Sequence, residues 1–327
     1  MITNDKALAA QALREGKLVA LPTETVYGLA ADASNAKAVQ RIFSVKGRPT
    51  NHPLIVHIAD ADQLSSWARD IPAVAYVLAD AFWPGSLTML LWRHESVVDE
   101  VTGGRDTVGL RVPAHELTLA VLREFGGAVA APSANRFGKV SPTTAAHVDS
   151  DLGSDVDVIL DGGACTVGVE STIVDLTTDQ PTVLRMGAVT IEQLTEVFGS
   201  APLVQVPHLE TNAKAPGMLA SHYSPSARVV LTSNELLENA LLTVLAENPT
   251  QKIAVLAPHQ SSVLDQAQFI DIVELEPAGD ADHYANVLYD RLRLVDRLGI
   301  DIVVCIPPPE DGIGQAVRDR LQRAANE

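Results

Sequence analysis

Three consecutive polar residues, Thr23, Glu24 and Thr25, follow a short apolar run over residues 18–21 and Pro22. A Tyr-Gly pair that favours a turn comes directly after them. Polar side chains at the end of a strand are typical of loops that meet a ligand, because the sheet behind the loop holds it in place. We therefore expect the end of this first strand to form part of a binding site.

Two basic residues, Lys46 and Arg48, flank Gly47 at the end of a predicted helix and precede Pro49. Arginine can hold a phosphate through two parallel hydrogen bonds and lysine adds a mobile point charge, so the pair would suit a polyphosphate. Alternatively, the two charges complement the dipole of the helix. The sequence contains no G-x-x-x-x-G-K-[ST] or G-x-G-x-x-G loop, so side chains would do more of the holding of any nucleotide.

Two further arginines stand alone among apolar neighbours. Arg111 lies within the run 109–113 and needs a partner, which is either an internal carboxylate in a salt bridge or the carboxylate or phosphate of a ligand. Arg185 lies at the end of another strand, where an exposed charge is the alternative to a ligand contact. The pattern leaves both choices open.

Three serines stand at the boundaries of predicted strands and helices. Ser133 comes after the strand predicted at 128–131, and Ser141 stands just before a predicted helix. The glycine-rich stretch 161–175 carries Ser171 to the start of a strand. These hydroxyls could meet a ligand, but turn and capping hydrogen bonds are an equal alternative, and strand alternation does not decide which face Ser171 takes.

Histidines and cysteines are not spaced to bind a metal ion. His52 and His57 are five residues apart, which sends them to opposite faces of a strand. Cys165 and Cys305 lie far apart without a C-x-x-C spacing, so neither a disulfide framework nor a zinc site is indicated. We expect both cysteines to be small buried side chains, and we predict no protein-bound metal site.

The elements that must position these residues follow from apolar periodicity. Through residue 200, β-rich runs alternate with amphipathic stretches, which indicates an α/β domain with helices packed on a twisted mixed sheet. Asn35 and Thr190 stand where helix N-caps belong. Strands are expected at 18–21, 54–58, 86–92, 108–112, 128–131, 157–160, 171–176 and 182–185, and helices at 4–15, 35–45, 71–81, 115–124, 143–149 and 190–197.

The periodicity fails between Gly199 and Ser226, a segment that contains four prolines. We therefore divide the chain into a first domain at 1–200, a linker at 201–226 that could fold back as a lid, and a second domain at 227–327. The second domain is expected to be a smaller, Rossmann-like α/β unit. Its strands are predicted at 228–231, 252–256 and 301–305, and its helices at 233–246, 281–298 and 311–325.

The 327-residue chain is acidic, with 41 Asp and Glu against 24 Lys and Arg and a net charge of −17. That charge favours solubility and opposes loose binding to nucleic-acid phosphates. The N-terminus has no apolar signal region, and no stretch of eighteen apolar residues occurs. We expect a cytoplasmic protein without membrane contact.

These motifs together, in this order, resemble the threonylcarbamoyl-AMP synthase family. The resemblance covers a YrdC-like catalytic domain over about residues 8–198, and the linker and second domain resemble the two-domain branch of the family. The motifs are the segments 22–29, 46–49 with 52–54, 109–113, 132–135 with 141–143, 171–172, and His222-Tyr223-Ser224-Pro225.

The resemblance implies a nucleotidyltransferase that makes threonylcarbamoyl-AMP and pyrophosphate from L-threonine, bicarbonate and ATP. The product serves threonylcarbamoyladenosine modification of tRNA through downstream threonylcarbamoyltransferase machinery. The threonine side of the pocket would be Thr25, His57, Arg111, the backbone of Ala131, and Ser171. The ATP side would be Arg48, His52, Thr107, Ser133, Ser141, Arg185 and Tyr223, with Lys46 beside the phosphates and Mg²⁺ entering with ATP. Lys46 and Arg48 would carry the catalytic charge.

This chemistry needs positioning and charge neutralisation more than a side-chain nucleophile, because the threonine carbamate is itself anionic. Two other functions are alternatives for this sequence. One is a non-catalytic RNA-binding or regulatory module with a weak RNA contact, which the acidic charge opposes. The other is an O-carbamoyl-transfer partner of hydrogenase maturation, whose zinc-finger and acylphosphatase-like parts have no counterpart in this sequence.

Overall fold

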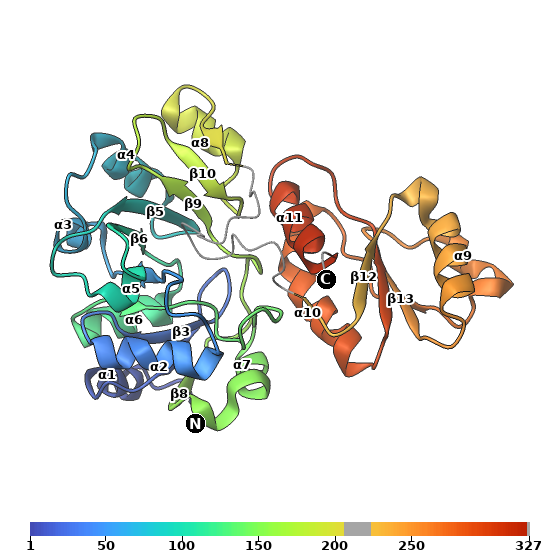
Figure 1. Ribbon diagram of the computed structural model, residues 1–327, viewed down its shortest axis with the longest axis horizontal. Helices are drawn as coiled ribbons and strands as arrows, with labels where there is room; N and C mark the ends of the chain where they lie inside the picture. The colour runs from blue at the N-terminus through green and yellow to red at the C-terminus, as the bar shows by residue number, and fades with distance from the viewer. Residues whose placement is uncertain (206–223, 326–327) are drawn as a thin grey trace. The chain divides into compact units, whose positions relative to one another are not determined.

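A computed structural model describes residues 1–205 and 224–325 of the chain. It separates into two compact units, the first holding most of residues 1–205 and the second holding residues 224–325. The α/β class of both units confirms the predicted fold (Figure 1). The boundaries of the linker and lid at 201–226 stay a prediction, because residues 206–223 lie outside the described residues.

The first unit is built on an 11-stranded mixed sheet in the order β1-β8-β2-β3-β7-β4-β6-β5-β9-β10-β11. At the centre of the sheet, β4 pairs with β6 in parallel, and β5 pairs with β9 in parallel. The strands are β1 Ile2–Thr3, β2 Val19–Leu21, β3 Gly28–Asp32, β4 Ile55–His57, β5 Leu87–Trp92, β6 Thr107–Arg111, β7 Val129–Ala130, β8 Val158–Leu160, β9 Thr172–Asp175, β10 Thr182–Arg185 and β11 Leu203–Val204.

Helices flank this sheet, and their ends follow ordinary capping chemistry. The Asn35 side chain accepts a hydrogen bond from the backbone N–H of Ala38, and Thr190 forms a capping box with Gln193, so both predicted N-caps are confirmed. The helices are α1 Lys6–Arg14, α2 Ala36–Lys46, α3 Leu64–Trp67, α4 Ala73–Phe82, α5 Asp99–Thr102, α6 Glu116–Phe125, α7 Ala145–Leu152 and α8 Ile191–Phe198.

The main core of the first unit lies on one face of the central strands. Val56, Leu110 and Met89 belong to it, each fully or almost fully buried. Burying a side chain of this size stabilises the fold by roughly 1.5–3 kcal/mol, so this face holds the centre of the sheet in place. Residues one step along each strand, such as Ile55 and Leu90, belong to a separate apolar cluster because alternate side chains point to opposite faces.

The second unit has a 4-stranded sheet in the order β12-β15-β13-β14, with every pair parallel. Helix α9 packs its apolar residues on one face, whereas α10 and α11 pack together and α11 lies against β12 (Figure 1). The elements are β12 Arg228–Leu231, α9 Leu237–Glu247, β13 Ile253–Leu256, β14 Val273–Glu274, α10 Ala281–Arg297, β15 Ile302–Cys305 and α11 Gly314–Ala325.

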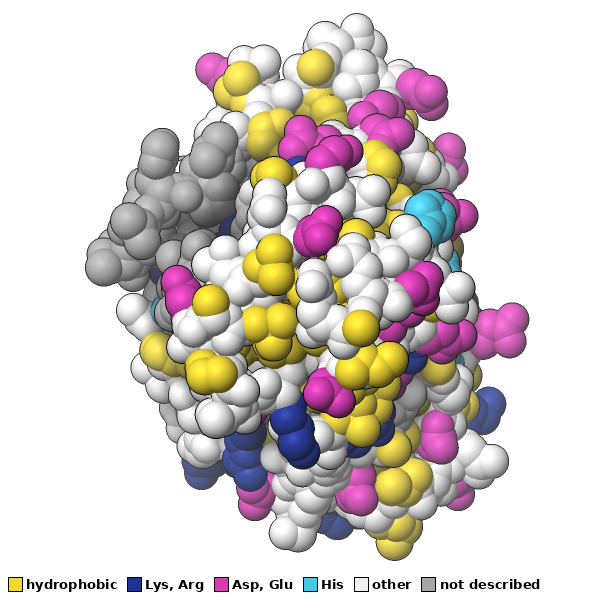
Figure 2. Space-filling model, turned by 90° about the vertical axis from the view of Figure 1, so that its right-hand side faces the viewer, with side chains coloured by type: hydrophobic (Ala, Val, Ile, Leu, Met, Phe, Trp, Pro, Cys, Tyr) yellow, Lys and Arg dark blue, Asp and Glu magenta, His cyan; other side chains and the backbone are white. Residues whose placement is uncertain are grey.

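Each unit buries one cysteine, as predicted. Cys165 and Cys305 are 4% and 0% exposed, and burial raises the pKa of each thiol to about 12. On the face of the molecule in Figure 2, Asp and Glu side chains are scattered widely, in keeping with the net charge of −17. Among the described residues, no helix combines the length and the apolar character needed to cross a membrane.

Candidate active site

Arg111 and His57 lie side by side at the carboxyl ends of two neighbouring parallel strands. The register of β4 and β6 pairs His57 with Arg111, and both side chains are buried, at 5% and 4% exposed. Parallel strands bring the residues at their carboxyl ends to one edge of the sheet, which is where such sheets place their functional groups. Two residues that are 54 positions apart in the sequence are thus brought together, as the predicted threonine pocket requires.

The Arg111 guanidinium is held by three groups from the loops at this edge. Its Nη2 forms an ion pair with Glu24 Oε1 at 2.6 Å, its Nη1 donates to Thr25 Oγ1 at 2.9 Å, and its Nε donates to the Gly85 carbonyl at 3.0 Å. Arginine carries five N–H groups, so two remain for another acceptor. Of the two partners considered for Arg111, the internal carboxylate is therefore present. The guanidinium also keeps N–H groups that could bind a ligand.

Glu24, which the residue-by-residue site prediction did not include, is the centre of this arrangement. Besides Arg111, its carboxylate accepts hydrogen bonds from Ser86 Oγ and from the backbone N–H of Ala114, each at 3.0 Å. Burial alone would raise the carboxyl pKa, but the charge and hydrogen bond of Arg111 outweigh it and hold the pKa below its usual value. Its position between Thr23 and Thr25 was the one signal in the sequence that could have identified it.

His57 is neutral in this setting. Burial and the neighbouring Arg111 charge lower its pKa to about 3. Its Nδ1 is buried without a hydrogen bond of normal geometry to any residue that the structure describes. A buried polar atom of this kind is costly unless a ligand or water satisfies it, which fits a place in a binding pocket.

Ser171 and Arg185 form a second cluster, next to the first. Ser171 Oγ lies 2.8 Å from the hydroxyl of Thr88 on β5, the strand between β6 and β9. Arg185 Nη2 donates to Ser171 Oγ at 3.0 Å, and its Nε donates to the Ser171 carbonyl at 2.9 Å. Arg185 is only 7% exposed, so an exposed surface charge is the wrong reading of this residue.

Lys46 holds the loop that carries Ser133. Its ammonium group donates to the carbonyls of Ser133 and Asn135 and to Asn135 Oδ1, which uses all three of its N–H groups. Burial, and then the Arg48 charge, lower the pKa of this amine well below its usual value. Contact between Lys46 and phosphate stays a prediction, and it would require some of these bonds to be exchanged.

Arg48 and His52 meet at Phe137. The Arg48 guanidinium lies over the Phe137 ring at 5.6 Å and donates to the Pro53 carbonyl, whereas His52 packs edge-on against the same ring. Burial, followed by the Arg48 and Arg105 charges, lowers the pKa of His52. Lys46 and Arg48, for which the helix dipole was the alternative, are both buried at the end of α2, at 3% and 8% exposed.

The structure describes three of the four remaining predicted residues, Ser141, Ala131 and Thr107. Ser141 is fully buried and donates to Glu170 Oε1 at 2.7 Å. The Ala131 N–H donates to the Ile55 carbonyl within the sheet, so its backbone could offer a ligand only its carbonyl. Thr107 shares a face of β6 with Arg111 but begins the strand, about 13 Å away at 3.3 Å per residue. Tyr223 lies outside the described residues.

Metal ligands do not gather here. No group of three or more His, Cys, Asp or Glu side chains in residues 1–205 and 224–325 could hold a metal ion. Of the carboxylates in the clusters, Glu24 is paired with Arg111 and Glu170 accepts a hydrogen bond from Ser141, while Arg48 and Arg185 add further positive charge. Such a site suits an anionic ligand that brings its own counter-ion.

Family models match both units of the chain. A model described as "Telomere recombination" matches residues 11–187, and one described as "Threonylcarbamoyl-AMP synthase, C-terminal domain" matches residues 189–326.

Relatives of known structure or curated name align over nearly the whole chain. It is 41% identical to a threonylcarbamoyl-AMP synthase of Pyrococcus abyssi, with 97% of this chain and 93% of the relative aligned. It is 39% identical to the Bacillus subtilis enzyme of the same name, over 99% of this chain and 94% of the relative. The crystal structure of P. abyssi Sua5 complexed with L-threonine matches with a TM-score of 0.92 at 39% identity, covering 99% of this chain and 97% of that one.

Proposed function

The chain belongs to the threonylcarbamoyl-AMP synthase family, and on that premise we propose that it converts L-threonine, bicarbonate and ATP into threonylcarbamoyl-AMP and pyrophosphate. The observation that carries the proposal is the buried group of Arg111, Glu24, Thr25 and His57 at the carboxyl ends of β4 and β6. It lies in a chain that matches a relative solved with L-threonine over 99% of its length.

We propose that threonine binds with its carboxylate against the two remaining N–H groups of Arg111. A guanidinium in a buried site favours a planar carboxylate, and Glu24 fixes its orientation. Thr25, Ser171 and the neutral His57 can exchange hydrogen bonds with the threonine hydroxyl, the amine and the carbamate. A site built to bind a hydroxyl rejects valine strongly, because valine leaves those polar groups unpaired.

ATP would lie across the same face of the sheet. The apolar side chains of Ile55, Leu90, Ile173 and Leu184 form a buried cluster there, and Gly109 of β6 lies between Ile55 and Leu90 in the strand register. A flat, largely apolar floor of this kind suits a nucleobase. The proposed ATP contacts are Arg48, His52, Thr107, Ser133, Ser141 and Arg185. Tyr223 is assigned to ATP from its sequence motif alone.

The proposed reaction has two steps, carbamate formation on the threonine nitrogen and transfer of the AMP group to that carbamate. Bicarbonate takes up a proton and loses water to give carbon dioxide. The threonine nitrogen then bonds to the carbon of carbon dioxide and releases a proton, which leaves a carbamate. A carbamate oxygen then attacks the α-phosphorus of ATP, and the bond from that phosphorus to the bridging oxygen of the β-phosphate breaks, releasing pyrophosphate. The second step is a nucleotidyl transfer, so we assign the enzyme to the nucleotidyltransferases.

Catalysis would come mainly from neutralising the phosphates and aligning the carbamate. Arg48 and Arg185 would supply this charge, and Lys46 supports the loop that carries Ser133. Mg²⁺ bound to the ATP phosphates would reduce their charge further. The described residues fit a metal that arrives with its phosphates, because no group of three or more possible ligands occurs among them.

The product would pass to the tRNA threonylcarbamoyltransferase machinery, and the protein would act in the cytoplasm. The matched relatives are synthases, so the comparisons favour this function over a non-catalytic RNA-binding module. Any direct RNA contact would have to be weak at a net charge of −17.

A pyrophosphate-release assay with purified protein tests the proposal. Release from ATP should require both threonine and bicarbonate, and valine should not replace threonine. Arg111→Ala should abolish the threonine-dependent release, because it removes the proposed carboxylate partner. Pyrophosphate release that does not depend on threonine would contradict the assignment. A near-normal rate of threonine-dependent release in Arg111→Ala would contradict it as well.

A further inference from the structure

The second unit contains a crevice where two neighbouring strands send the chain to opposite faces of the sheet. β12 and β15 are adjacent and parallel, with Leu231 in register with Cys305. The chain leaves β12 toward α9, which covers one face, and leaves β15 toward α11, which lies with α10 on the other face (Figure 1). Open parallel sheets bind ligands at the carboxyl ends of strands at such a switch point, because the diverging chains leave a gap there.

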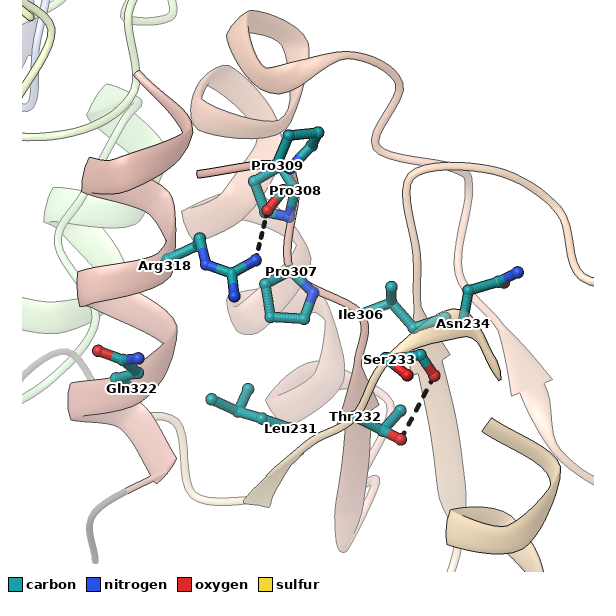
Figure 3. Close-up of a pocket in the computed structure, with 10 residues that line it drawn as sticks. All are labelled: Leu231, Thr232, Ser233, Asn234, Ile306, Pro307, Pro308, Pro309, Arg318 and Gln322. Carbon is teal, nitrogen blue, oxygen red and sulfur yellow. Dashed lines mark hydrogen bonds between the residues drawn. The ribbon is translucent and has the colours of Figure 1, made fainter. Parts of the chain in front are cut away.

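The gap is a cavity of about 500 Å³, within the range of sites for small organic molecules. Its walls are largely apolar and come from Leu231, Ile306 and the run Pro307–Pro309 (Figure 3). Prolines have no backbone N–H, so this loop offers ring surfaces and carbonyls rather than amide donors. Proline rings beside aliphatic side chains form an apolar surface that suits a weakly polar body such as a nucleobase.

Polar groups border this apolar surface. Arg318 and Gln322, one turn apart on α11, line the cavity, and Thr232 lines it from the end of β12 (Figure 3). Arg318 Nη1 donates to the Pro308 carbonyl at 2.7 Å, and Nη2 pairs with Glu310 Oε1 at 2.8 Å. Of the five N–H groups of the guanidinium, three remain for a ligand.

Charge limits what this cavity can hold. Among the described residues that line it, Arg318 is the one with a positive charge. A single guanidinium that already has a carboxylate partner matches one anionic group, whereas a triphosphate would bring more charge than it can offset. The amide of Gln322 and the hydroxyl of Thr232 can bind the polar edge of a ring or a sugar hydroxyl.

We propose that this crevice binds a nucleoside monophosphate, with its phosphate on Arg318 and its base against the Pro307–Pro309 rings. The site belongs to the second unit alone, and it does not depend on the reaction proposed for the first. It would give the second domain a ligand of its own.

Titration of isotopically labelled, full-length protein with AMP tests the proposal. The backbone amide signals of Thr232, Ser233 and Gln322 should shift and saturate. Adenosine and inorganic phosphate should each bind at least about tenfold more weakly than AMP, because each lacks one of the two recognised parts. Shifts confined to the first unit would overturn the crevice site and leave the synthase proposal intact.

Variants separate recognition from folding. Arg318→Ala should weaken AMP binding at the crevice by about tenfold or more, as expected for loss of a charge-assisted hydrogen bond. Because Arg318 also holds the Pro308 carbonyl, Gln322→Leu provides a second variant that keeps the loop contact and should still weaken binding. Arg297→Ala, which removes an exposed arginine of α10, is the control and should bind as the parent protein does. Equal AMP affinity in all of these variants, or equal affinity for AMP and phosphate, would refute the proposal.

Discussion

At the scale of single residues, the buried pair of Arg111 and Glu24 is the feature on which the proposed recognition of threonine depends. Removing one member of a buried ion pair leaves a charge that neither water nor protein stabilises, at a cost of roughly 3–5 kcal/mol. Glu24 uses one N–H group of Arg111, and two others stay available for threonine. In the proposed site, Glu24 therefore positions Arg111 and does not touch the reacting atoms.

Glu24→Gln therefore should raise the KM for threonine more than the KM for ATP. The amide keeps the shape of the side chain but removes the charge that orients Arg111, and we expect a lower melting temperature as well. Steady-state kinetics with each substrate varied in turn would measure the split. Glu15→Gln, at an exposed pair with Lys17, serves as the control and should change neither value. An equal rise of both KM values would indicate general damage instead of lost positioning.

His57 should make the protein less stable as the pH falls through the weakly acidic range. The folded state keeps the imidazole neutral down to about pH 3, whereas the unfolded chain takes up a proton near pH 6.5. The unfolded state thus binds more protons between these values, and the free energy of unfolding decreases by about 1.4 kcal/mol for each pH unit lost within that window.

Chemical unfolding measured from pH 7.5 to 4.5 would detect this slope. In His57→Gln the slope should become shallower by the contribution of one proton, because the amide does not titrate. Glu24 works in the same direction but at lower pH. Its folded pKa lies below its usual value, so its contribution is present above the unfolded pKa and is lost only as the pH falls through the folded one. An unchanged slope in the variant would show that His57 does not remain neutral.

At the scale of elements, the site depends on backbones that approach one another closely. Gly187, just after β10, would place an added Cβ only 2.3 Å from the Thr172 nitrogen and 2.4 Å from the Glu170 carbonyl oxygen. Backbone atoms cannot move aside as the tip of a side chain can, so the segment with Ser171 must shift if this glycine is replaced.

Gly187→Ala should therefore lower the melting temperature and the activity together. Gly109→Ala is the matched comparison, because its Cβ would make ordinary contacts at 3.4 Å or more with Thr88 and Ile55. That variant should fold normally and, if the floor of the site takes the base of ATP, should raise the KM for ATP. Thermal unfolding and kinetics of both variants would check this, and a normally stable Gly187→Ala would contradict the packing argument.

Elements with clear periodicity could be read from the sequence, and those fixed by long-range contacts could not. The helix expected at 115–124 is α6, Glu116–Phe125, and the strand expected at 182–185 is β10. The strand β3 was missed because the run Gly28–Asp32 has no β-branched residue and follows a turn-like pair. Its pairing with β2 and β7 is a tertiary effect.

The same limit applies to the site. Isolated arginines in apolar strands indicated buried, partnered charges, and both Arg111 and Arg185 are buried. Which partner they have was beyond the sequence, because Glu24 is 87 positions from Arg111 and only the fold brings them together. The three acceptors of Lys46 could not be predicted from the sequence either. Two of them are backbone carbonyls, which every residue type has.

At the scale of the whole molecule, the first unit has its own sheet and core, whereas the predicted lid at 201–226 carries the Tyr223 motif assigned to ATP. A fragment that ends after residue 205 keeps β11 and should fold, but it should release pyrophosphate more slowly and need more ATP. Circular dichroism and the assay described above would test this. A fragment as active as the full chain would show that the lid prediction is wrong.

The two buried cysteines allow the unfolding of the protein to be followed by thiol modification. Alkylating reagents attack thiolates, and a buried thiol with a pKa near 12 presents almost none, so the folded chain should resist labelling. One cysteine lies in each unit. The rates at which Cys165 and Cys305 become modified would therefore measure the unfolding of each unit separately, in a single sample and without an engineered cysteine.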